Sequence, residues 1–171
     1  MDINSFRFDS VRLFKAKNSG KKIKNVVYSE LYNLSLPTQS LFDELKDRDF
    51  VTTLLGLQKV EDNMYIIPFP ALRRMLGVTL KKSLALKIEG PRVIQSIITY
   101  VLYDGTLLYE VSFRVIDHSN GNCSLSVSLV IYYAETFLKR EDKVKKRLEI
   151  VTMSIMENMR KVLAPYLITH A

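Results

Sequence analysis

The feature that most constrains this chain is a long run of alternating strands that ends in one amphipathic helix. From about residue 80 to residue 133 the pattern is typical of β-strand almost without a break, and apolar residues then recur at helical spacing over about 141–167. An antiparallel sheet with one apolar face needs a cover, and this helix is the only large cover that the chain offers. We therefore predict an α+β protein with a cavity for an apolar molecule between helix and sheet.

The strand run is divided by turn signals. Asp104-Gly105 is a strong hairpin signal, and the segment His118-Ser119-Asn120-Gly121 predicts the next turn. Gly90-Pro91 is also predicted to turn the chain, so we expect separate strands at 84–88 and 93–103. The strands after Asp104 alternate apolar and polar residues, which sets their register and indicates a meander.

The first half of the chain changes texture at Pro37. A strand is predicted from about 23 to 36, and the apolar spacing then becomes helical as far as Gly56, which indicates two short helices. Two short strands follow, at 57–60 and 64–69. The closing helix carries one apolar stripe, formed by Val144, Leu148, Val151, Ile155, Met159, Val162 and Tyr166.

The formal charge of +7 is concentrated at the N-terminal end, where residues 1–24 hold seven basic and two acidic residues. We predict that residues 1–23 form a basic arm or an extra strand and that residues 24–171 form the domain. Phe6, Phe8, Val11 and Leu13 suggest the strand. A solvated arm is the simplest interpretation, and contact with nucleic acid or an anionic membrane surface is the alternative. The scattered aromatic residues do not pair with the basic run, which disfavours nucleic acid.

The order of elements resembles the START-like or SRPBCC superfamily, which includes polyketide cyclases and lipid-transfer domains. The local match is best at LSLPTQSLFDELKDRDF, where Pro37, Phe42, Leu45 and Asp47 occupy the proline, aromatic, aliphatic and aspartate positions of the pattern. The tryptophan often found in the first helix is absent. The resemblance implies a helix-grip fold: a curved seven-stranded antiparallel sheet wrapped around the long C-terminal helix, with two short helices after the first strand and an elongated apolar cavity.

We predict from this that the chain binds or transports a hydrophobic small molecule, such as a lipid or an isoprenoid. A cyclase or hydratase acting in the same cavity is the alternative, as is an interaction module working through the basic arm. Met153, Met156 and Met159 suit a lining that adapts to a flexible ligand. Arg73 and Arg74 are expected at the cavity mouth. The predicted cavity residues are Tyr65, Tyr100, Tyr109, Phe113, Leu129, Val151, Ile155 and Met159.

Other chemistry finds little support in the sequence. The two histidines, His118 and His170, do not have the spacing of a metal site, and Cys123 lies on the apolar side of a strand as a core residue would. No phosphate-binding loop or dinucleotide motif is present, so we predict no cofactor and no catalytic residue. A single cysteine, no secretory signal and no apolar run of the ~18–20 residues that a spanning helix needs predict a cytoplasmic protein.

Overall fold

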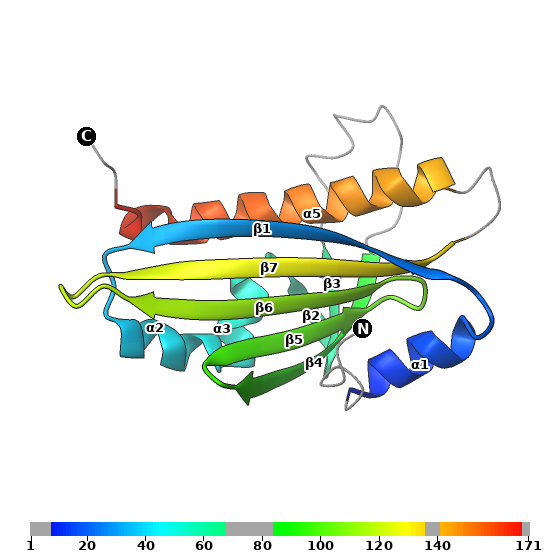
Figure 1. The fold of residues 1–171 in the computed structure, drawn as a ribbon, viewed down its shortest axis with the longest axis horizontal. Coiled ribbons are helices and arrows are strands. Elements are labelled where there is room, and N and C mark those ends of the chain that lie inside the picture. Colours follow the sequence, from blue (N-terminus) through cyan, green and yellow to red (C-terminus); the bar gives the residue numbers. More distant parts are fainter. Residues whose placement is uncertain (1–7, 68–83, 136–140, 169–171) are drawn as a thin grey trace.

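The computed structural model describes residues 8–67, 84–135 and 141–168. It has an α+β architecture in which helices cover both faces of one sheet (Figure 1). The elements in chain order are α1 (Asp9–Lys17), β1 (Ile23–Leu34), α2 (Thr38–Leu45), α3 (Arg48–Leu54), β2 (Gln58–Glu61), β3 (Met64–Ile67), β4 (Leu84–Ile94), β5 (Ile97–Tyr103), β6 (Leu108–Asp117), β7 (Cys123–Ala134), α5 (Glu141–Leu163) and a 3₁₀ turn (Ala164–Tyr166).

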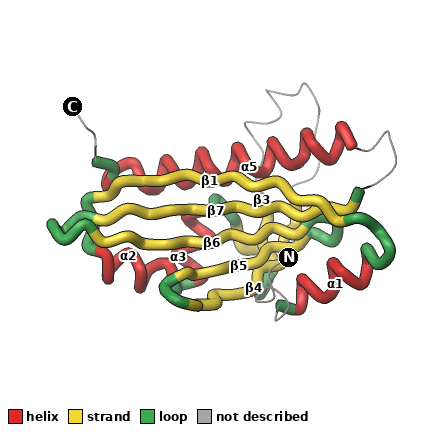
Figure 2. The backbone as a smooth tube through the Cα atoms, in the orientation of Figure 1, coloured by secondary structure: helices red, strands yellow, loops and turns green. Residues whose placement is uncertain are grey.

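The sheet has seven strands in the order β1-β7-β6-β5-β4-β3-β2, and every neighbouring pair is antiparallel. The meander from β4 to β7 follows the chain, whereas β1 returns to pair with β7 along its whole length, with Tyr28 opposite Leu129 (Figure 2). The predicted seven-stranded helix-grip arrangement is therefore confirmed. The edge strand β1 runs alongside α5 in the same view.

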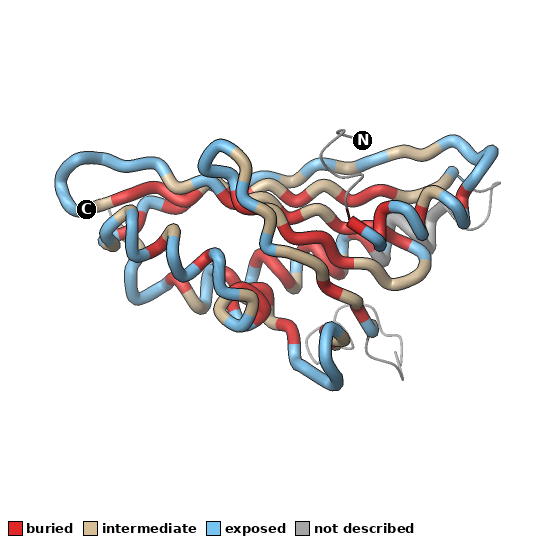
Figure 3. The backbone as a smooth tube through the Cα atoms, turned by 90° about the horizontal axis from the view of Figure 1, so that it is seen from below, coloured by how far each residue is buried: buried red, intermediate tan, exposed pale blue. Residues whose placement is uncertain are grey.

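Alternation divides the side chains of the sheet between two faces. The face toward α5, here called the inner face, carries paired rows such as Tyr100–Val111–Leu129 and Ile98–Phe113–Val127. These side chains are buried with Leu148, Val151, Ile155 and Met159 of α5 in one large hydrophobic cluster. The opposite, outer face is buried only in part, because Val101 and Leu108 are buried there whereas Val27 and Leu31 are exposed. Figure 3 shows how burial varies along the strands.

The two short helices after β1 are confirmed. Asp47 is the N-cap of α3, and its carboxylate accepts a hydrogen bond from the backbone nitrogen of Asp49 at 3.0 Å. Gly56 follows α3 with φ of +77°, which glycine adopts without steric cost. Its close neighbour is Asn158 of α5, whose amide donates to the carbonyls of Thr53 and Leu54 at 2.9 and 3.1 Å. This contact anchors α5 to α3.

The closing helix is shorter than its sequence pattern predicts. α5 ends at Leu163, and Tyr166, expected in the buried stripe, is 44% exposed. Pro165 is the physical reason, because it lacks a backbone N–H and cannot continue an α-helix. After the 3₁₀ turn the chain pairs with the end of β1 instead, where the nitrogen of Ser35 donates to Tyr166 O at 2.8 Å.

The expected strand at the N-terminal end is wrong. Residues Asp9–Lys17 form a helix, α1, which buries Val11 and Phe14 against Val101 and Leu108 on the outer face. Val11 and Phe14 are three positions apart, so they lie on the same side of a helix. The sheet supplies the apolar surface against which this side is buried, and this burial stabilises the helix. Phe6 lies outside the described residues. The domain boundary at residues 23–24 stays a prediction.

The turn expected at Gly90-Pro91 is also wrong. β4 continues through this pair with a cis peptide bond and an irregularity in its pairing with β5 between Glu89 and Arg92. The hairpin turn lies at Gln95 and Ser96, which have φ of +49° and +68°. A two-residue turn with both φ values positive matches the twist of the flanking strands, although neither residue is a usual turn signal there. The predicted strand 93–103 is consequently shared between β4 and β5.

Among the helices in the described ranges, none combines the length and the apolar character that crossing a lipid bilayer would require.

Candidate functional site

The eight predicted cavity residues come from five elements and meet between the inner face and α5. Tyr65 lies on β3, Tyr100 on β5, and Tyr109 and Phe113 on β6. Leu129 lies on β7, and Val151, Ile155 and Met159 lie on α5. All eight are buried and belong to the same hydrophobic cluster. The prediction that they line a ligand cavity is not tested by their burial and stays a prediction.

The two central tyrosines of this region have their hydroxyl groups committed to the protein. The Tyr100 hydroxyl donates to the carbonyl of Leu45 at 2.7 Å, which ties β5 to the end of α2. The Tyr109 hydroxyl donates to the carboxylate of Asp104 at 3.0 Å. Burial raises the pKa of Tyr100 above its ordinary value, so its phenol stays neutral. Both side chains therefore act as packing groups with satisfied hydroxyls.

A groove of about 530 Å³ opens between β1 and α5. One wall is the inward side of β1, and the other is the side of α5 that faces this edge strand. Met156 and Thr152 are buried at its base, whereas Met153 is 47% exposed at its rim. The lining residues are Tyr28, Ser29, Glu30, Thr152, Met153, Met156, Glu157 and Arg160.

A charged network closes one end of this groove. The guanidinium of Arg160 donates to Glu30 at 2.5 Å, joining α5 to β1. The hydroxyl of Tyr32 donates to the other oxygen of the same carboxylate. Burial, followed by the hydrogen bond to Glu30, raises the pKa of Tyr32. Tyr28, Met153 and Met156 thus give the groove its apolar surface, whereas Glu30, Glu157 and Arg160 give it charged groups.

Thr152 is the unusual residue of the groove. Its side chain is 6% exposed, and its hydroxyl oxygen is the one buried side-chain polar atom without a hydrogen-bond partner within the part of the chain that the structure describes. A buried hydroxyl without a partner costs about 1–3 kcal/mol of stability, so native proteins seldom keep one. The sequence analysis did not single out Thr152. A polar residue four positions after Leu148, on the buried stripe, was the available signal.

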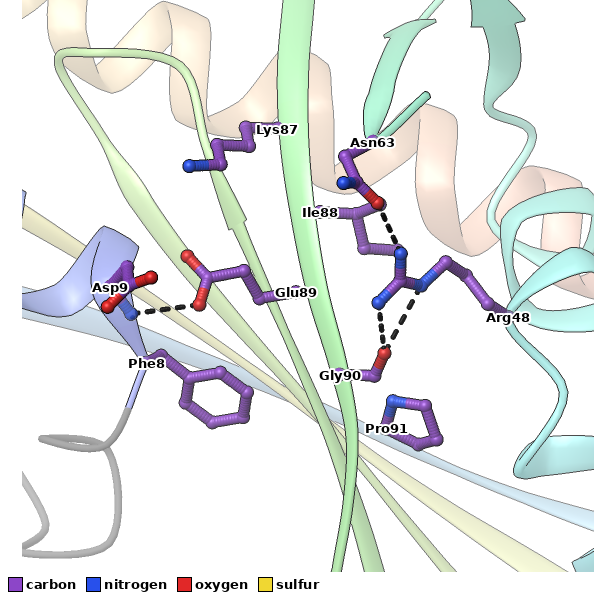
Figure 4. Close-up of a pocket in the computed structure, with 9 residues that line it drawn as sticks. All are labelled: Phe8, Asp9, Arg48, Asn63, Lys87, Ile88, Glu89, Gly90 and Pro91. Atoms are coloured by element: carbon purple, nitrogen blue, oxygen red, sulfur yellow. Dashed lines mark hydrogen bonds between the residues drawn. The ribbon is translucent and has the colours of Figure 1, made fainter. Parts of the chain in front are cut away.

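A second hollow, of about 470 Å³, lies between α1, β4 and the start of α3 (Figure 4). The side chains of Arg48 and Glu89 in this hollow form hydrogen bonds with the protein. Arg48 donates to the carbonyl of Gly90 and to the side chain of Asn63. The carboxylate of Glu89 accepts from the backbone nitrogens of Asp9 and Ser10 at 2.8 and 2.6 Å. These bonds fasten α3 and α1 to β4, so we interpret this hollow as structural.

The other candidate residues of the sequence analysis lie in different parts of the chain. Arg73, Arg74 and His170 lie outside the described residues. Cys123 is buried on the inner face, and burial raises the pKa of its thiol. His118 lies in the predicted turn with its ring against the hydroxyl of Ser124. Within residues 8–67, 84–135 and 141–168, no three histidine, cysteine, aspartate or glutamate side chains gather as a metal site would need.

No family model and no curated protein matches the chain in sequence. Solved structures match it in fold. The Zhui aromatase/cyclase from Streptomyces sp. R1128 has a TM-score of 0.54 at 8% identity, over 84% of this chain and 93% of that protein. Norcoclaurine synthase from Thalictrum flavum has a TM-score of 0.55 at 10% identity, over 84% of this chain and 86% of that one. The chain therefore shares the helix-grip fold of these proteins, as its order of elements predicted.

Proposed function

We propose that this protein binds a hydrophobic small molecule between the inner face of the sheet and α5, and that the groove between β1 and α5 forms part of the binding site. The observation that carries the proposal is this groove, which is lined by Tyr28, Met153 and Met156 together with Thr152, whose buried hydroxyl has no partner among the described residues. A lipid or an isoprenoid is the class of ligand that we expect.

The size and the walls of the groove support this proposal. Its volume of about 530 Å³ falls within the roughly 300–1,000 Å³ that is usual for small-molecule sites. Met153 and Met156 supply flexible thioether side chains, which adjust to ligands of different shape. Tyr28 faces them from β1 and adds an aromatic wall.

Thr152 supports a ligand that carries one hydrogen-bonding group. Thr152 is a lining residue of the groove, where a hydroxyl or carbonyl oxygen of the ligand could pair with its side-chain hydroxyl. Pairing would remove the cost of the unsatisfied group. Binding therefore gains from a polar atom near the middle of an otherwise apolar molecule.

Binding without catalysis is favoured over a cyclase or hydratase. The solved cyclase and the synthase of this fold are named for reactions, but their likeness to this chain concerns the fold alone. A reaction would need convergent polar groups that are free to act on the ligand. Among the predicted cavity tyrosines, Tyr100 and Tyr109 already donate to Leu45 and Asp104.

Native mass spectrometry of the purified full-length protein, before and after organic extraction, tests the proposal. We expect an added mass that extraction removes, and a fluorescent fatty acid should then bind to the extracted protein and be displaced by the recovered compound. Protein that purifies without a bound ligand and does not bind the fluorescent fatty acid would contradict the proposal.

A pair of glutamate substitutions tests whether the groove is the site. Met153→Glu places a charge at the rim of the groove, so probe affinity should fall by at least about tenfold. Leu31→Glu is the matched control, because Leu31 is 60% exposed on β1 and lies outside the groove lining. Equal probe affinity in the two variants would show that the ligand does not use the groove.

A further inference from the structure

The short helix α1 has two different sides. Val11 and Phe14 face the sheet and are fully buried, whereas Arg12, Leu13, Ala16 and Lys17 form an exposed stripe on the opposite side. This spacing places the four side chains on one face of the helix. Leu13, 51% exposed, is thus an apolar side chain held outward between two cationic ones.

The charge of this segment is strongly one-sided. Between Asp9 and Lys24, the chain has a single acidic residue, Asp9 itself. Lys21 and Lys22 are exposed in the loop that follows the helix and extend the cationic surface beyond its end. The basic residues of the segment are Arg12, Lys15, Lys17, Lys21, Lys22 and Lys24. Of these, Lys24 is paired with Glu135 at 2.8 Å, and Arg12 lies 3.9 Å from Asp9.

The helix is held in place before any partner arrives. The carboxylate of Glu89 accepts from the backbone nitrogens of Asp9 and Ser10 at the start of α1. Near its end, the ammonium group of Lys17 donates to the carbonyl of Gly105. Phe14 packs edge-on against Tyr103 between these two contacts. A surface that is ordered in advance loses little conformational freedom on binding.

We propose that α1 and the loop to Lys22 dock the protein on an anionic lipid bilayer. Basic residues near such a surface each add to the attraction, and this attraction extends over a Debye length of about 10 Å at 0.1 M salt. Leu13 would enter the boundary between head groups and acyl chains, with Lys21 and Lys22 reaching the phosphates nearby. With one leucine inserted, the contact is reversible.

The same features fit other partners less well. Single-stranded nucleic acid is bound by basic grooves with aromatic rings on which bases stack, but Phe8 and Phe14 are both buried under α1. A stable protein interface buries about 800 Å² on each partner, more than the exposed side of a nine-residue helix provides. This inference is independent of the proposed function, because neither α1 nor its loop lines the groove between β1 and α5.

Vesicle co-sedimentation with the full-length protein tests the proposal. We expect binding to vesicles that contain phosphatidylserine and none to vesicles of phosphatidylcholine alone. Added salt should release the protein. The double variant Lys21→Glu/Lys22→Glu should lower partitioning at least tenfold, and Leu13→Ser should lower it by roughly fivefold.

The variant Lys46→Glu/Lys161→Glu is the control, since it changes the net charge equally on exposed residues after α2 and near the end of α5, away from α1 (Figure 1). It should keep most of the binding, and thermal unfolding verifies that all variants are folded. An equal loss in the control, or no vesicle binding at low salt, would overturn the proposal. Binding of an RNA oligonucleotide through Lys21 and Lys22, with no binding to vesicles, would overturn it as well.

Discussion

The two faces of the sheet are covered in different ways. On the inner face, α5 contributes Leu148, Val151, Ile155 and Met159 to one large cluster that also contains α2 and α3. On the outer face, Phe8 and the α1 residues Val11 and Phe14 form a small cluster with Val101, Leu108 and Tyr132, the buried sheet residues of this cluster within the described ranges. The same strands supply both clusters, because alternate residues point to opposite faces.

The difference indicates which cover maintains the fold and which is an addition to it. Apolar burial stabilises in proportion to area, so the inner cluster accounts for most of the stability. The outer helix depends on a few side chains and on the carboxylate of Glu89, which makes α1 the element that can detach at lower cost. Substitutions on the inner face should therefore lower the free energy of unfolding more, and disturb more of the structure, than substitutions on the outer face.

The largest effect is expected on the inner face. Ile155→Asp would bury a charge without a partner beneath α5, and we expect a loss of more than about 4 kcal/mol in the free energy of unfolding. Circular dichroism during urea unfolding measures this loss. Met153→Asp, on the exposed side of the same helix, should cost little, and similar losses in both variants would contradict the assignment of the inner cluster as the main core.

A smaller and local effect is expected on the outer face. Phe14→Ala removes the central contact of α1 and should cost about 3 kcal/mol. Hydrogen exchange should show faster exchange at the amides of residues 12–17, while the strands of the inner cluster keep their protection. Leu13→Ala is the control on the same helix, because Leu13 is exposed. Loss of protection throughout the sheet in Phe14→Ala would mean that the two clusters are not separable.

Substitution of two buried threonines, Thr152 and Thr52, distinguishes a hydroxyl that a ligand can use from one that stabilises the fold. Thr152→Val removes a hydroxyl without a partner and should raise the free energy of unfolding by about 1 kcal/mol while weakening ligand binding. Thr52→Val removes a hydroxyl that donates to the carbonyl of Asp49 at 3.0 Å, so it should lower stability by about 1 kcal/mol. A loss of stability in Thr152→Val would show that the hydroxyl has a structural role.

The smallest effect concerns the fastening of α1. Glu89→Gln keeps the shape of the side chain but removes the charge that interacts with the first backbone nitrogens of the helix, and it should cost about 0.5–1 kcal/mol. The amides of Val11 and Arg12 should exchange faster than in the unmodified protein. Glu44→Gln on α2 serves as the control, and no difference between the two variants would argue against Glu89 as the cap.

Much of the fold was predictable because its signals are local. The alternation in β6 and β7, Pro37 before the two short helices and the stripe on α5 each reflect contacts within a few residues. The inner-face residues, such as Tyr100 and Phe113, were predictable for the same reason. The turn at Gln95 and Ser96 was not, because neither residue is one that usually adopts positive φ in a hairpin.

By itself, the sequence determined the seven strands, the two short helices and the apolar stripe of α5, because periodicity is a property of neighbouring residues. Only the tertiary structure decided that Asp9–Lys17 is a helix, since the outer face of the sheet and a carboxylate 80 positions away stabilise it. The groove with Thr152 at its base likewise forms where β1 meets α5, more than 100 residues later in the chain. Such contacts depend on how elements are brought together in space, and no local pattern encodes them.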